Sequence, residues 1–135
     1  MLLALDIFFI VFHSTLILFV LFGWISVKTR KAHLVMVGLT GGSWFILGIF
    51  YGIGFCPLTE WHWQVLRQMG ETGLPVSYVQ YILHRLLGIS ITASFADKIT
   101  LLGLMIPAAL SVYLHLRDFR RSRRQQPGRT STSLW

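Results

Sequence analysis

Residues 7–27 read IFFIVFHSTLILFVLFGWISV, and residues 28–31, directly after them, read KTRK. An apolar run of this length is long enough to cross the hydrocarbon core of a bilayer as one helix. Basic residues beside such a run tend to stay on the cytoplasmic side of the membrane. The two stretches therefore predict a membrane-spanning helix whose second end faces the cytoplasm, with the N-terminus outside.

The composition of the whole chain supports a membrane protein. Of its 135 residues, 54% are hydrophobic and only 13% are charged, whereas a soluble domain carries about 25% charged residues. The formal net charge of +7 is concentrated beside the apolar runs, so it indicates topology and attraction to anionic lipid rather than nucleic acid. We predict an all-α integral membrane domain over residues 1–118.

Two further apolar runs complete the predicted membrane domain. Residues 34–56 form the second span, which ends at Pro57 because proline disfavours helical geometry in the residue before it. Residues 99–116 form the third span, with a kink expected at Pro107. The chain has two strongly basic regions, residues 28–31 and residues 117–129. Three spans place both of them in the cytoplasm, as the charge rule requires.

The segment between the second and third spans, residues 57–98, is external in this arrangement. We expect one or two amphipathic helices there, lying on the outer surface. The alternative is a four-helix transmembrane bundle, which would bring Arg85 near the bilayer centre at a cost on the order of 3 kcal/mol. It would also put the two basic regions on opposite sides. We expect residues 119–135 to form a basic, disordered cytoplasmic tail.

Asp6 and His13 are the first candidates for function, because they are polar residues of a membrane span. They lie seven residues apart and so share one helix face, and polar groups within a membrane usually face the protein interior. His13 could hydrogen-bond a neighbouring helix, ligate haem or a metal, or accept a proton. A haem held by two histidines of one chain is disfavoured, since we expect no second histidine at the depth of His13; a dimer could still supply one.

The outer segment holds the remaining polar candidates. Acid–base chemistry or lipid binding there would use Glu60, His62, His84 or Arg85. The chain has no HExxH motif, no Ser/His/Asp spacing and no phosphate-binding glycine loop. We therefore lean away from an enzyme and keep a lipid-directed membrane enzyme as an alternative.

Glycines recur along the second span, with Gly38 and Gly42 four residues apart and Gly48 and Gly52 likewise. Small residues at this spacing let two helix backbones approach closely in lipid. They predict either that the second span is the central helix of the chain or that it contacts a membrane protein partner, such as a second copy.

A short motif at the end of the second span resembles a family of bacterial membrane proteins called domain of unknown function 2784. The motif comprises Cys56, Pro57, Leu58 and Thr59. The resemblance covers residues 3–116, and His13 and His33 match histidines typical of the family. It implies a bacterial inner-membrane location and no established activity. Physically, Pro57 stops the second span and Thr59 is expected to cap the next helix.

These observations order the functional hypotheses. The leading one is a small inner-membrane accessory or scaffold subunit. The first alternative is a protein that binds haem or another cofactor through His13, and the second is an enzyme acting on lipid at the outer surface.

Overall fold

The computed structural model describes residues 1–52 and 54–125, and these residues form helices without any strand. The elements are α1 (Leu2–Phe22), α2 (Arg30–Gly42), the π-helical turn η1 (Ser43–Leu47), α3 (Gly48–Tyr51), α4 (Pro57–Gln68), α5 (Tyr78–Leu87) and α6 (Ala93–Arg124). The all-helical class predicted from the sequence is confirmed.

Three helical stretches are long and apolar enough to cross a membrane: Leu2–Phe22, Arg30–Tyr51 and Ala93–Arg124. Many of their large apolar side chains are exposed, such as Ile49, Phe50 and Val11, which suits a helix surrounded by lipid. The three-span prediction is therefore confirmed. The alternative with a fourth crossing is wrong, because α5 has only 10 residues and a span needs about 20.

The second span ends earlier than the sequence predicted. Its last helical residue is Tyr51, and Gly52 then takes a positive φ of 108°, a conformation in which glycine avoids the strain of a side chain. Within the span, the Ser43 hydroxyl donates a hydrogen bond to the carbonyl of Phe55 at 3.1 Å. The chain then reaches the first residue of α4, Pro57, without helical structure at the described positions.

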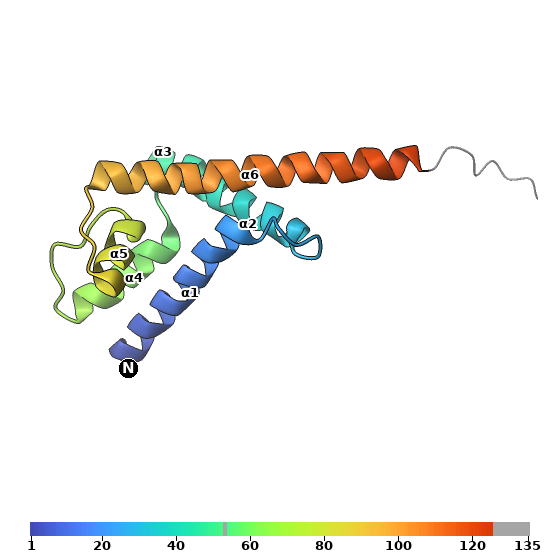
Figure 1. The fold of residues 1–135 in the computed structure, drawn as a ribbon. Coiled ribbons are helices and arrows are strands. Elements are labelled where there is room, and N and C mark those ends of the chain that lie inside the picture. Colours follow the sequence, from blue (N-terminus) through green and yellow to red (C-terminus); the bar gives the residue numbers. More distant parts are fainter. Residues whose placement is uncertain (53, 126–135) are drawn as a thin grey trace, which may run out of the picture.

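The third span is longer than predicted. It continues as one helix through the buried Pro107, and the ribbon runs on without a break to Arg124 (Figure 1). The predicted disorder of the tail is therefore wrong for residues 119–124, which extend α6. Residues 126–135 lie outside the described part of the chain.

Helices α4 and α5 lie in the angle between α1 and the first half of α6 (Figure 1). Their shared core consists of Trp63, Leu66 and Tyr78. The side chain of Ile17, from α1, packs against this core. The two predicted amphipathic helices are thus confirmed, and one apolar face of the pair packs on α1.

Candidate functional site

Asp6 is the one acidic residue of α1, and its side chain is completely buried. A buried carboxylate is costly unless it is paired and hydrogen-bonded. His62 Nε2 lies 2.8 Å from Asp6 Oδ1. Arg85 donates two hydrogen bonds to the same carboxylate: Nη1 lies 2.9 Å from Asp6 Oδ1, and Nη2 lies 2.6 Å from Asp6 Oδ2. A single carboxylate therefore connects α1 to both α4 and α5.

His62 extends this network to a tyrosine. Its Nδ1 lies 3.1 Å from the hydroxyl of Tyr78, and both side chains are buried. Burial lowers the pKa of His62 and raises the pKa of Tyr78. The imidazole is then neutral near pH 7, so Nε2–H donates to Asp6 and Nδ1 accepts from the tyrosine hydroxyl. We call Asp6, His62, Tyr78 and Arg85 the Asp6 cluster.

Aromatic rings enclose the Asp6 cluster. The rings of His13 and Tyr78 stack with centroids 3.9 Å apart, and Trp63 stacks on the same tyrosine at 5.4 Å. Phe9 stacks on His62 at 5.4 Å. These rings keep water from the hydrogen bonds, which strengthens them. The Nδ1 atom of His13 is itself buried and has no hydrogen-bond partner among the described residues.

Arg85 links the buried carboxylate to the surface. Its side chain is 35% exposed, and it also hydrogen-bonds the hydroxyl of Tyr81. The hydrogen bonds to Asp6 raise the pKa of Arg85, so the guanidinium stays charged. The Asp6 cluster is therefore an ion pair with one partly accessible end.

The structure groups four of the predicted candidates and separates the others. Asp6, His62 and Arg85 bond directly, and His13 joins them through Tyr78. We expected no second histidine at the depth of His13, yet in the structure His62 contacts the same tyrosine ring as His13. That prediction assumed that the segment after the second span lies flat on the membrane, whereas α4 packs along α1.

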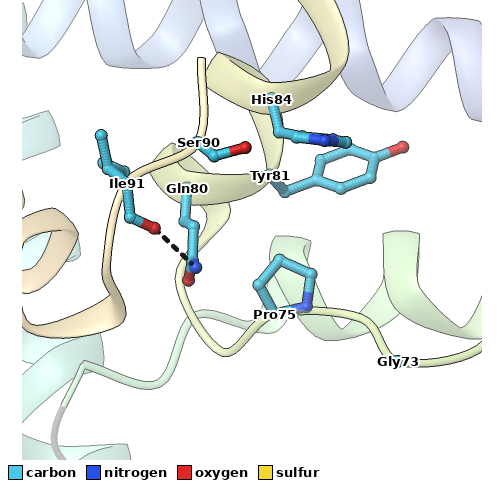
Figure 2. Close-up of a pocket in the computed structure, with 7 residues that line it drawn as sticks. All are labelled: Gly73, Pro75, Gln80, Tyr81, His84, Ser90 and Ile91. Carbon is cyan, nitrogen blue, oxygen red and sulfur yellow. Dashed lines mark hydrogen bonds between the residues drawn. The ribbon is translucent and has the colours of Figure 1, made fainter. Parts of the chain in front are cut away.

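Two candidates of the outer segment lie outside the Asp6 cluster. Glu60 pairs with Arg67 on the partly exposed side of α4. His84 is exposed and lines an open hollow of about 220 Å³ beside Tyr81 (Figure 2). Two lining residues of this hollow are hydrogen-bonded: Gln80 Nε2 donates to the carbonyl of Ile91 at 3.0 Å. The four residues proposed for lipid chemistry therefore share no common surface, and His62 is fully buried.

His33 lies in a second cluster, at the C-terminal end of α1. Its Nε2 donates to the carbonyl of Val20 at 2.7 Å, and the side chain is fully buried. Nearby, Arg30 donates through Nε to the carbonyl of Trp24 at 3.3 Å and forms a salt bridge with Asp118 of α6. We call His33, Arg30 and Asp118 the Arg30 cluster; it fixes the loop between α1 and α2 against α6.

The Cys56–Thr59 motif forms the start of α4. Cys56 precedes the helix in an extended conformation and Pro57 is its first residue, a position that suits proline because its missing N–H would have no partner there. Thr59 is buried inside the first turn, and no side chain caps the helix. The predicted capping role of Thr59 is therefore wrong.

The glycines of the second span make few contacts within the chain. A Cβ atom at Gly38 would meet nothing within 4 Å, and one at Gly42 would meet only Ile46 of the same span, at 3.9 Å. Gly48 is buried and Gly52 ends the helix. Packing inside this chain therefore does not depend on the face that carries Gly38 and Gly42.

Two tyrosines at this site, Tyr78 and Tyr81, were not among the candidates from the sequence. Tyr78 and Tyr81 contact His62 and Arg85 directly, but an aromatic residue in a membrane protein is usually an interfacial anchor. No group of three or more His, Cys, Asp or Glu side chains in residues 1–52 and 54–125 could hold a metal ion.

A family model described as "Protein of Unknown function (DUF2784)" matches residues 3–116, so the chain belongs to that family. No curated protein and no solved structure matches this chain.

Proposed function

We propose that this member of the DUF2784 family is an accessory or scaffold subunit of a bacterial inner membrane, with the N-terminus outside and the end of α6 in the cytoplasm. The observation that carries the proposal is the double engagement of Asp6, which bonds α4 through His62 and α5 through Arg85. Since a buried carboxylate needs both partners, this arrangement favours one fixed orientation of the two helices on α1.

The pair α4–α5 offers an apolar surface for contact with other molecules. Trp61, Leu86 and Leu87 are each more than half exposed. Such side chains suit the membrane interface or a protein partner. In this proposal the Asp6 cluster keeps that surface in place, and the spans anchor it in the membrane.

The open face of α2 supports a partner within the bilayer. A Cβ atom added at Gly38 or Gly42 would meet no atom of another span within 4 Å among the described residues, and small residues four apart permit close helix packing in lipid. We propose that a transmembrane helix of another subunit, or of a second copy, packs there.

Native mass spectrometry of the full chain extracted in mild detergent tests this proposal. The wild-type protein should be recovered in a defined assembly, and the double variant Gly38→Leu/Gly42→Leu as the bare chain. Within the described residues, a Cβ atom added at either position would meet no atom of another span within 4 Å, so we expect the chain itself to tolerate both changes. Ala109→Leu, at an exposed position of α6, is the matched control and should keep the assembly. A wild-type protein that is always monomeric would contradict the proposal.

One observation favours a second function, proton transfer. Asp6, His62 and Tyr78 form a continuous hydrogen-bonded chain, and His13 stacks on its last member. Ionisable residues within membranes often mark proton relays. Vesicles containing the purified protein and a pH-sensitive dye would show a proton flux that His62→Phe abolishes. No flux in the wild type would remove this function and leave the scaffold proposal intact.

A further inference from the structure

The last two turns of α6 carry four arginines on one face. Arg117, Arg120, Arg121 and Arg124 follow the i, i+3, i+4, i+7 spacing that places side chains side by side on a helix. Together with Tyr113 and Leu116, one turn earlier, they line an open hollow of about 400 Å³. The end of α6 extends past the rest of the described chain (Figure 1), so this face is open. We call it the basic face.

The other arginines of this region already have partners. Arg30 pairs with Asp118, and the guanidinium of Arg123 lies over the ring of Phe119, 4.7 Å from its centroid. Only Arg117 of the basic face approaches an acid, at 3.4 Å from Asp118 Oδ1.

Among the described residues, no carboxylate forms a salt bridge with Arg120, Arg121 or Arg124. Like charges at these spacings repel one another. An anion bound among the three guanidiniums would therefore relieve that repulsion.

The length of α6 places the basic face at the level of lipid headgroups. The helix has 32 residues and so extends about 48 Å at 1.5 Å per residue, whereas the hydrocarbon core is about 30 Å thick. Tyr113 is 63% and Leu116 is 49% exposed. Tyrosine is enriched at the membrane–water interface, so these two residues mark the boundary and the arginines lie beyond it.

We propose that the basic face binds the phosphate of an anionic phospholipid in the leaflet at this end of α6. Planar guanidiniums bind phosphate oxygens in pairs, and the three that form no salt bridge with the described acids line one hollow. The exposed Tyr113 and Leu116 adjoin the arginines on the side where acyl chains begin. They favour a lipid over free phosphate. The site is separate from the Asp6 cluster and does not depend on the scaffold proposal.

The test is a titration of the full-chain protein in detergent, followed by native mass spectrometry. Dioleoyl-phosphatidylglycerol is the probe and dioleoyl-phosphatidylcholine the neutral comparison. Arg120→Gln/Arg121→Gln/Arg124→Gln removes three charges from the basic face. Lys28→Gln/Lys31→Gln/Arg123→Gln is the matched control, because it removes three charges near the same end of the spans without touching this face. All the substituted side chains are exposed, and none forms a salt bridge with the described residues. Only Arg123 has a further contact, with the ring of Phe119, so both variants should fold.

The proposal predicts that the wild type binds phosphatidylglycerol more tightly than phosphatidylcholine. The triple variant of the basic face should weaken phosphatidylglycerol binding at least about tenfold, because it removes three guanidiniums that would pair with the phosphate oxygens. The control should weaken it less than about threefold. Equal losses in the two variants would show a general charge effect and overturn the site. Displacement of the lipid by millimolar inorganic phosphate would overturn the assignment to a lipid.

Discussion

Two charged clusters position α1, and they differ in burial. In the Asp6 cluster the carboxylate and His62 are both 0% exposed. In the Arg30 cluster the guanidinium is 8% exposed, but its partner Asp118 is 41% exposed. Water can therefore reach the Asp118 carboxylate, whereas it cannot reach Asp6 or its partner His62. The Asp6 carboxylate, which also has a second, buried partner, should therefore contribute more to stability than the Asp118 carboxylate.

The largest expected effect is that of Asp6→Asn. The amide has nearly the shape of the acid but leaves Arg85 and His62 without their carboxylate. Removing one partner of a buried pair costs about 3–5 kcal/mol. Circular dichroism during unfolding in mixed detergent micelles measures this loss. Asp97→Asn, at an exposed acid near the start of α6, is the control and should change stability little. Equal stability of the two variants would contradict the comparison.

The sequence analysis named three of the four residues of the Asp6 cluster as candidates, Asp6, His62 and Arg85, but it did not predict that they meet. The seven-residue spacing of Asp6 and His13 indicates a shared face, and these two are the buried residues of α1. Their partners could not be predicted, because His62 and Arg85 lie 56 and 79 residues from Asp6 along the chain. Hydropathy describes which helices enter the bilayer, and it carries no information on how an amphipathic helix packs against one of them.

The spans were more predictable than their ends. Apolar runs and basic flanks indicated three spans, and the structure has three helical stretches that are long and apolar enough to cross a membrane. The end of the second span was placed at Cys56 because Pro57 is a strong helix breaker, but Gly52 ends the helix first by taking a positive φ. Apolar composition continues past that glycine, so hydropathy could not detect the break.

Gly23→Ala should have the next largest effect, and it acts at the Arg30 cluster. A Cβ atom there would lie 2.6 Å from the carbonyl oxygen of Phe19 and 3.0 Å from the ring of His33. Because one of these contacts is with backbone, the helix end must shift, at a cost of about 1–3 kcal/mol. The same unfolding assay measures it. Gly38→Ala, with no atom within 4 Å of the new methyl, should be neutral or stabilising; a comparable loss there would refute the explanation.

The free energy of unfolding should depend on pH through His62 of the Asp6 cluster. Burial lowers the pKa of His62 below its ordinary value of 6.5, so the unfolded chain binds more protons than the folded one below about pH 6.5. Stability should therefore fall between pH 7 and pH 5. His62→Phe should reduce that slope, whereas His84→Gln, at an exposed position, should leave it unchanged. Parallel pH profiles for the wild type and His62→Phe would exclude this contribution.

Asp118→Asn should have the smallest effect. It removes the salt bridge to Arg30, but the acid is 41% exposed and the guanidinium keeps its hydrogen bond to the carbonyl of Trp24. A pair of this kind contributes about 0.2–1 kcal/mol. The unfolding assay at low and high salt should show a small loss that salt diminishes. A loss as large as that of Asp6→Asn would mean that burial does not separate the two clusters.

Hydrogen–deuterium exchange followed by mass spectrometry tests most directly whether one carboxylate holds α4 and α5 on α1. We would compare wild type with Asp6→Asn and Asp97→Asn in the same detergent. The account predicts at least about tenfold faster exchange over Pro57–Gln68 and Tyr78–Leu87 in Asp6→Asn alone, with α2 and α6 unchanged. Unchanged protection of both helices in Asp6→Asn would contradict it.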